Sequence, residues 1–320
     1  MPRIDVHHHF FPALLEKAKL NETIGWRTPE ENLPWTPEIS IKSMDESNVD
    51  IAILSFPAIS IGTVGEGNRT QVRKVNVMAA DICNKYPTRF AFFASLPVLD
   101  DVEGGLAEIA YALDTLGAQG IAMPSSSGVG SDAKYIGHEI YDAIWAELDK
   151  RGTVVHVHGS QTPSSTPHPD PFLGLPIVEV PNETYKAAAH LVVTGRKRKY
   201  PNVKIILAHM GGSMPFLYSR VAVLSTHMGC QLTRDEIIED FKTFYFDTAL
   251  SGHESVLRTM DSFVDRNRLL FGSDFPAVST EMATWYTKNV EEYYAGDQNA
   301  LDDIMYKSAL KLFPTLRLRP

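Results

Sequence analysis

Three consecutive histidines stand near the beginning of the chain, at the end of the run from Ile4 to His9. This run is typical of a short strand, along which side chains alternate between two faces, so we expect His7 and His9 on one face and His8 on the other. Two imidazoles one strand step apart can share one divalent metal ion. An expression-tag remnant or a solvated histidine cluster is the alternative, and further ligands at later strand ends would favour a metal site.

Other residues that bind metals or move protons stand where later apolar runs end. His158 closes one such run, and His156 lies two residues earlier on the same face, so periodicity alone does not choose between them. We expect His158 in a site because it is nearer the carboxyl end, and His156 as a packed or hydrogen-bonded histidine. His209 and Asp274 close two further runs. A carboxylate in that position can bind metal or transfer a proton.

Apolar runs of strand length alternate with amphipathic segments of helical length. The expected strands are 4–9, 51–56, 90–96, 120–123, 153–158, 204–209, 244–248 and 269–274. The expected helices between them include 71–85, 104–116, 140–150, 183–198 and 233–242. Eight buried strands with helical crossovers predict an α/β fold, a (β/α)8 barrel of the TIM type. Polar residues at the strand ends favour the barrel over a doubly wound sheet, because barrel enzymes build their sites on that face.

Two stretches are too long for simple connections. Residues 11–38 would form an N-terminal insertion after the first strand, and residues 160–181 a long loop after the fifth. We expect both to cover the barrel mouth and shape a pocket, and plain surface excursions are the alternative. No composition break, repeat or low-complexity linker divides the chain, so we expect residues 1–320 to form one domain.

The overall composition excludes several classes of protein. A net charge of −9 argues against nucleic acid or an anionic membrane surface as the partner. The two cysteines, Cys83 and Cys230, are too few for a disulfide framework. No apolar run is long enough to span a membrane, and the N-terminus lacks a signal-peptide pattern. We therefore expect a soluble cytoplasmic protein that binds neither nucleic acid nor membranes.

Five features of the sequence form one pattern: the pair His7 and His9, the later histidine His158, the run 209–216 (HMGGSMPF) and the run 272–276 (GSDFP). Taken together, they resemble the amidohydrolase superfamily, and more narrowly the branch typified by aminocarboxymuconate semialdehyde decarboxylase. The runs 86–90 (YPTRF) and 245–248 (YFDT) also resemble that branch, and the similarity extends along nearly the whole chain.

This resemblance implies a site built around one divalent metal ion. The implied ligands are His7, His9, His158 and Asp274. His209 would be the catalytic acid or base, and Arg220 would reach a substrate carboxylate, in some members from the neighbouring subunit of a homodimer. Three histidines and an aspartate suit zinc, although manganese occupies similar sites. The fourth expected strand has no lysine, which favours one metal ion over two, and Gly159 departs from the proline found in many relatives.

The implied reaction is the non-oxidative release of CO2 from a small aromatic carboxylic acid, an ortho-hydroxybenzoate. The preferred substrate is 6-methylsalicylate, because the histidine triplet and the compact loops resemble fungal 6-methylsalicylate decarboxylases. Asp274 or His209 would protonate the ring carbon that bears the carboxylate. Trp26 and Phe275 are expected near the mouth, where they would bind the ring. The alternative is a metal-dependent hydrolase or hydratase that acts on a lactone or an unsaturated acid.

Overall fold

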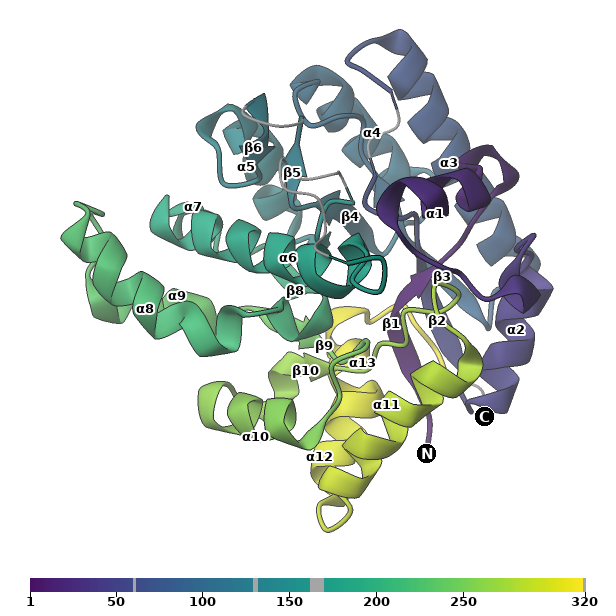
Figure 1. Cartoon of the computed structure of the whole chain (residues 1–320). Helices are drawn as coiled ribbons and strands as arrows, with labels where there is room; N and C mark the ends of the chain where they lie inside the picture. The colour runs from purple at the N-terminus through teal and green to yellow at the C-terminus, as the bar shows by residue number, and fades with distance from the viewer. Residues whose placement is uncertain (60–61, 129–131, 162–169, 319–320) are drawn as a thin grey trace.

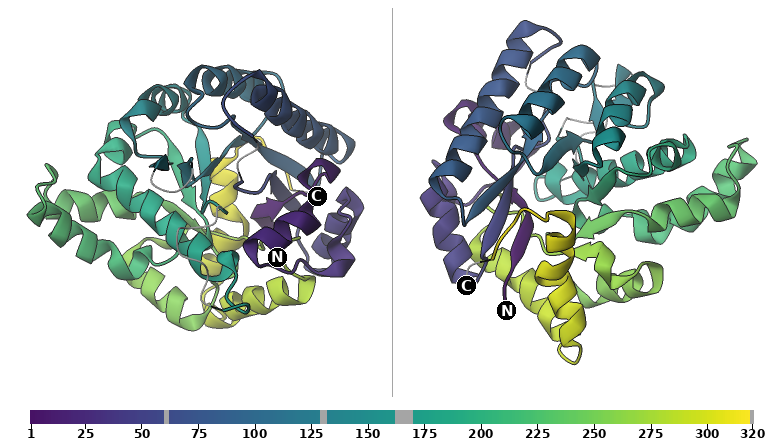
Figure 2. Two further views of the ribbon diagram at one scale, coloured as in Figure 1. Left: turned by 45° about the horizontal axis from the view of Figure 1, so that its top comes forward. Right: turned by 180° about the vertical axis from the view of Figure 1, so that it is seen from behind.

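The computed structural model describes residues 1–59, 62–128, 132–161 and 170–318. Eight parallel strands form one sheet in the order β1-β2-β3-β4-β7-β8-β9-β10, with helices around it (Figures 1 and 2). The strands are β1 Ile4–His9, β2 Ile51–Ser55, β3 Phe90–Ser95, β4 Gly120–Pro124, β7 Val154–His158, β8 Lys204–Leu207, β9 Tyr245–Asp247 and β10 Leu269–Leu270. The predicted (β/α)8 barrel is confirmed.

The two edges of the sheet meet next to β10. The amide of Val6 donates to the carbonyl of Phe271 at 3.0 Å, and the amide of Asp274 donates to the carbonyl of His7 at 2.9 Å. The eighth strand was predicted to run to residue 274 but ends at Leu270. The residues that follow still bond to β1, and this irregular backbone carries Asp274 to the mouth of the barrel.

The helices connect the strands and cover their outer faces. They are α1 Lys17–Ile24, α2 Pro37–Glu46, α3 Glu66–Lys85, α4 Val102–Asp114, α5 Asp142–Arg151, α6 Leu175–Val193, α7 Arg196–Lys199, α8 Met214–His227, α9 Arg234–Lys242, α10 Glu254–Phe263, α11 Thr280–Tyr293, α12 Gln298–Asp302 and α13 Ser308–Leu312. A small antiparallel hairpin, β5 Ser126–Ser127 with β6 Lys134–Tyr135, follows β4 and was not predicted. No helix in the described ranges is long and apolar enough to span a membrane. The cytoplasmic location stays a prediction.

The predicted loop 160–181 is partly wrong. Residues 162–169 lie outside the described residues, but α6 already begins at Leu175, with Pro176 in its first turn and Pro181 in its interior. Proline is well tolerated in a first turn, whereas an interior proline removes one backbone hydrogen bond. Two of the prolines that suggested a loop, Pro176 and Pro181, therefore lie in a helix at the barrel mouth.

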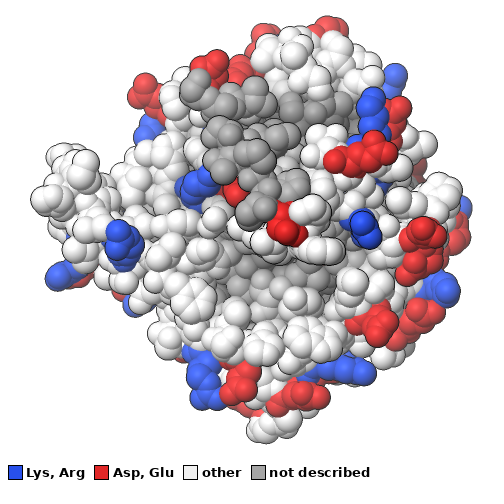
Figure 3. Space-filling view, viewed as in Figure 1, with Lys and Arg blue, Asp and Glu red and all other residues white. Residues whose placement is uncertain are grey.

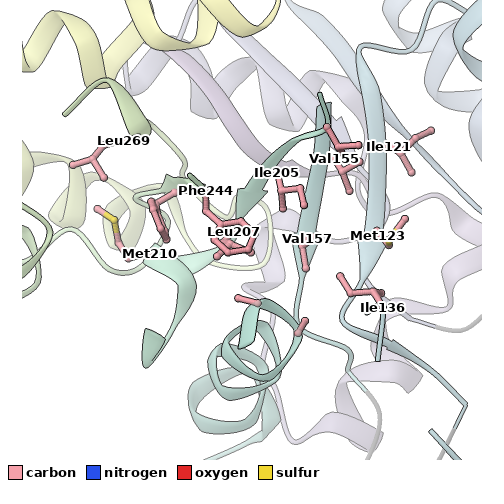
Figure 4. Close-up of a cluster of buried hydrophobic side chains, with 14 of the residues drawn as sticks. Ile121, Met123, Ile136, Val155, Val157, Ile205, Leu207, Met210, Phe244 and Leu269 are labelled. Carbon is pink, nitrogen blue, oxygen red and sulfur yellow. The ribbon is translucent and has the colours of Figure 1, made fainter. Parts of the chain in front are cut away.

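Strand residues divide between an outer and an inner core. Val155 and Val157 of β7 pack with Ile205 and Leu207 of β8 in the cluster between sheet and helices (Figure 4). Because side chains alternate, His156 and His158 of β7 face the barrel interior. A second cluster fills the base of the barrel and includes Ile4, Val6, Ile51, Ile53, Phe93, Val154, Ile206, Leu270 and Phe313. The inner face is therefore apolar at the base and polar at the mouth.

Candidate metal centre and active site

A β-bulge in β1 aims the histidines at the barrel axis. Ile4 lies opposite Ile51 and His9 lies opposite Ser55, so β1 uses one more residue than β2 over the same span, and the register shifts between Asp5 and His8. Such a bulge lets two consecutive residues face the same side. It allows Ile4 and Val6 to join the apolar base while His7 and His9 face the mouth, which strict alternation from Ile4 would not permit.

Three ligand atoms converge at this position. The Nε2 atoms of His7 and His9 lie 3.3 Å apart, and Asp274 Oδ1 lies 3.4 Å from His7 Nε2 and 3.2 Å from His9 Nε2. A tetrahedral ion with bonds of about 2.0–2.2 Å separates its ligand atoms by roughly 3.3–3.6 Å. The spacing of these three atoms therefore fits a metal ion.

Two more imidazoles complete the cluster. Ligand atoms of His7, His158 and His209 lie within 4.8 Å of one another, and the rings of His9 and His158 are 5.4 Å apart between centroids. All of these side chains are buried. The structure thus brings together the five residues that the sequence suggested, from β1, from the end of β7, and from the segments that follow β8 and β10.

Each of these histidines is oriented through its other ring nitrogen. His9 Nδ1 lies 3.2 Å from the carbonyl of Ser55, His158 Nδ1 lies 2.9 Å from that of Gly159, and His209 Nδ1 lies 3.0 Å from that of Ala249. A carbonyl oxygen only accepts, so Nδ1 carries the proton and Nε2 keeps its lone pair. Metal-binding histidines are commonly held in this way.

Asp247, at the end of β9, holds several parts of the cluster in place. Its Oδ2 accepts from His7 Nδ1 at 3.0 Å and from His156 Nε2 at 2.9 Å, and its Oδ1 accepts from the amide of His209 at 3.0 Å. The sequence did not assign Asp247 a role, although it lies in one of the resembling motifs. The geometry agrees with the expectation that His156 is a hydrogen-bonded histidine, and its ring also stacks on Phe93.

The electrostatics of the cluster suit a cation. Burial acts to raise the pKa of Asp274, but hydrogen bonds and charges from His7 and His9 hold the pKa well below its usual range. Burial lowers the pKa values of His158 and His209, and the charge of His7 lowers both further. Burial also acts to lower the pKa of His7, but Asp247 and Asp274 together raise it to about 10. The carboxylates and the imidazoles of His158 and His209 are therefore in the protonation states that bind metals, whereas His7 carries a proton that it would release to a bound ion.

Backbone strain is concentrated at the same place. His209, Met210 and Asp274 all have positive φ values, of 56°, 53° and 62°. Non-glycine residues seldom adopt this conformation, and such strain persists only where the surroundings enforce it. Asp5 helps to enforce it near Asp274, because it accepts hydrogen bonds from both the amide and the hydroxyl of Ser273.

Helix α6 packs closely against the barrel mouth. A Cβ atom at Gly159 would lie 1.9 Å from the carbonyl oxygen of Val180, and one at Gly212 would lie 2.0 Å from that of Pro181. No side chain fits at either position unless α6 moves away. This contact restricts position 159 to glycine and holds α6 directly against the end of β7.

Two adjoining cavities share His9, Pro57 and His158. The first comprises ≈ 780 Å³, including space open to solvent, and is walled mainly by apolar residues such as Phe56, Leu96 and Met123. The second comprises ≈ 430 Å³ on the same measure and lies beneath the N-terminal insertion. Its lining includes Lys17, Trp26, His209 and Asp274. His9 and His158 therefore lie where the two cavities meet, and His209 and Asp274 face the second cavity.

Of the three residues predicted to bind substrate, only Trp26 lines one of the two cavities. Trp26 lines the second cavity, and its indole Nε1 donates to the carbonyl of Ala277 at 2.9 Å. Phe275 does not line either cavity, because it is buried on the other side of β1 with its ring 5.4 Å from that of His8. The structure thus does not support the expected contact between Phe275 and a substrate. Arg220 is exposed on α8 and lines neither cavity of its own chain.

The model of the amidohydrolase family matches residues 4–315, and the chain belongs to this family, as the sequence predicted. The chain is 36% identical to the 6-methylsalicylic acid decarboxylase of Aspergillus aculeatus, over 98% of this chain and 97% of that protein. It is 35% identical to the 6-methylsalicylic acid decarboxylase of Penicillium expansum, over 99% of this chain and 98% of that protein.

The fold is also similar to solved structures. A dihydroxybenzoic acid decarboxylase from a Polaromonas species, solved with bound manganese and the inhibitor 2-nitroresorcinol, has a TM-score of 0.83 to this chain. The two are 22% identical, and the match covers 99% of this chain and 98% of the other. This similarity supports the barrel architecture.

Proposed function

We propose that this chain is a metal-dependent carboxy-lyase that releases CO2 from a small ortho-hydroxybenzoate, with 6-methylsalicylate as the preferred substrate. The observation that carries the proposal is the buried cluster of His7, His9 and Asp274 beside an apolar chamber. The identity to two 6-methylsalicylic acid decarboxylases along nearly the whole chain supports the choice of substrate.

The proposed metal ligands are His7, His9, His158 and Asp274, around one divalent ion. Zinc is our assignment, because three imidazoles and a carboxylate suit it and the spacing of His7, His9 and Asp274 fits a tetrahedral ion. The manganese in the Polaromonas protein makes that ion the alternative to compare. When bound, the ion would act as a Lewis acid that orients the hydroxybenzoate and offsets its negative charge.

Residues of this chain would supply the proton and form the pocket that binds the aromatic ring. Protonation of the ring carbon that carries the carboxylate gives an intermediate from which CO2 can leave as the ring becomes aromatic again. Asp274 or His209 would deliver this proton. A hydrogen bond to the carbonyl of Ala249 holds His209 Nδ1, so Nε2 of the same ring remains available for the transfer. The apolar chamber of Phe56, Leu96 and Met123 would exclude water and accept a methyl-bearing ring.

Removal of the metal tests this function. Protein stripped by a chelator should lose decarboxylation of 6-methylsalicylate, and one equivalent of zinc or manganese per chain should restore it, with the better ion identifying the natural one. The product should be 3-methylphenol, which has lost CO2. A product that has gained water would support the hydrolase or hydratase, and full activity in stripped protein would contradict a metal-dependent reaction.

We further propose that the protein is a homodimer in which α8 contacts the partner and Arg220 enters the partner's site. Helix α8 extends away from the barrel together with α9 (Figure 1), and that lobe shows mostly uncharged side chains in Figure 3. Phe216 and Val223 of α8 are 61% and 51% exposed, and Met228, which directly follows the helix, is 82% exposed. Apolar side chains this exposed are typical of surfaces that bind another protein. Within the described ranges, Arg220 forms no hydrogen bond or ion pair that would occupy its guanidinium.

Mixed dimers test the placement of Arg220. Arg220→Ala and His209→Ala proteins should each be inactive, whereas co-expression should restore about a quarter of the wild-type activity, because half of the dimers would contain one intact site. Sedimentation should show two chains per particle. An active Arg220→Ala protein, or no restoration in confirmed mixed dimers, would contradict a site shared between subunits.

A further inference from the structure

Lys17 is a buried cation inside the candidate active site. It is the first residue of α1 and only 8% exposed, and it lines the same cavity as Trp26, His209 and Asp274. No sequence pattern indicates this position, because Lys17 lies in the N-terminal insertion among several charged residues. A lysine is rarely buried unless an anion or hydrogen-bond acceptor compensates its charge.

No such partner is present among the described residues. The ammonium group of Lys17 forms no hydrogen bond or ion pair there, and its nearest aromatic contact is the ring of Phe11, at 4.9 Å from the ring centroid. A cation–π contact gives some stabilisation but supplies no negative charge. Burial lowers the pKa of Lys17 to about 8, and the charge of Asp274 only partly opposes this shift.

Asp274 cannot fully compensate Lys17 if it also binds the metal. A divalent ion held by one carboxylate and three neutral imidazoles keeps a net positive charge, and Lys17 adds a second positive charge to the same cavity. Like charges in a cavity with little water repel strongly. The cavity is therefore complementary to an anion that enters between the metal ligands and α1.

We propose that Lys17 binds the carboxylate of the aromatic acid substrate, so that each chain provides its own anion-binding residue on the α1 side of the cavity. The identity of this acid rests on the proposed function. Lys17 would select acids over the corresponding phenols and would release the phenol product more readily than the substrate. Arg220 lies outside the cavities of its own chain, so it would reach the same carboxylate only from the partner subunit.

Binding measurements separate this role from a structural one. Metal-loaded His209→Ala protein, in which turnover is blocked, is titrated with 6-methylsalicylate and with 3-methylphenol, and Lys17→Met is then added to the same background. A hydrogen-bonded ion pair predicts that Lys17→Met weakens binding of the acid by about 10- to 100-fold. Binding of the phenol should stay within about twofold, a change of less than about 0.5 kcal/mol, and this also shows that the variant is folded.

Lys19→Met is the matched control. Lys19 lies on the same helix, but it is exposed and pairs with Glu16 at 3.7 Å, so its replacement should change neither affinity. Three results would each overturn the proposal. The Lys17→Met variant binds the acid as tightly as the His209→Ala parent does, it loses acid and phenol binding in parallel, or the parent itself binds no acid. If the acid binds in a Lys17-dependent way but the wild-type protein releases no CO2, the anion site stands and the assignment as a decarboxylase is wrong.

Discussion

Replacing His209 with alanine is expected to lower turnover of 6-methylsalicylate by about 10²–10⁴-fold, the range that general acid–base catalysis contributes. The metal content should remain at the wild-type level, because His7, His9 and Asp274 form a compact group of ligand atoms without His209. Turnover is measured as CO2 release, and bound metal is measured by elemental analysis of the same samples.

His253→Ala is the control for this substitution. His253 is exposed at the start of α10 and stacks on Trp285, outside both cavities, so its loss should leave turnover unchanged. Near-normal activity in the His209→Ala protein would remove His209 from the mechanism and leave Asp274 as the proton donor. Loss of the metal together with activity would instead identify His209 as a ligand.

Replacing Asp247 with alanine is expected to impair both the metal centre and the fold. The substitution leaves the buried His7 and His156 without their carboxylate partner and the amides of His209 and Ala249 without their acceptor. Breaking a buried charged pair lowers the free energy of unfolding by about 3–5 kcal/mol. Loss of a residue that orients a metal-binding histidine costs about 10–100-fold in metal affinity.

Denaturant unfolding of metal-free protein and a competitive metal titration measure these two effects separately. Asp235→Ala is the matched control, because Asp235 is an exposed residue in the first turn of α9. An Asp247→Ala protein that unfolds and binds metal as the wild type does would contradict the role of Asp247 as the residue that positions His7.

Periodicity and residue type were sufficient to predict the barrel and the segments that carry the site. Each strand has an apolar run, and the polar residues at the carboxyl ends must meet in a closed parallel sheet. The bulge in β1 was not predictable, because the run from Ile4 to His9 also fits a regular strand. Only the register against β2 shows that Val6 and His7 oppose the same part of the neighbouring strand.

One physical reason accounts for the residue that the sequence wrongly assigned to the substrate pocket and for the two residues that it overlooked: tertiary contacts decide the role of each. Phe275 directly follows Asp274, but its side chain packs behind β1 beside His8. The role of Asp247 depends on the position of β9 beside the histidines of β1 and β7. The role of Lys17 depends on the position of α1 over the barrel mouth. The organisation of residues 1–320 as one domain stays a prediction.

The most direct test of the proposed chemistry is CO2 release by protein that holds one metal ion per chain, offered a panel of ortho-hydroxybenzoates that includes 6-methylsalicylate and 2,6-dihydroxybenzoate. We expect release from at least one acid, with 6-methylsalicylate preferred, and an equal amount of the matching phenol. No release from any member of the panel by fully metal-loaded protein would contradict the assignment as a hydroxybenzoate decarboxylase.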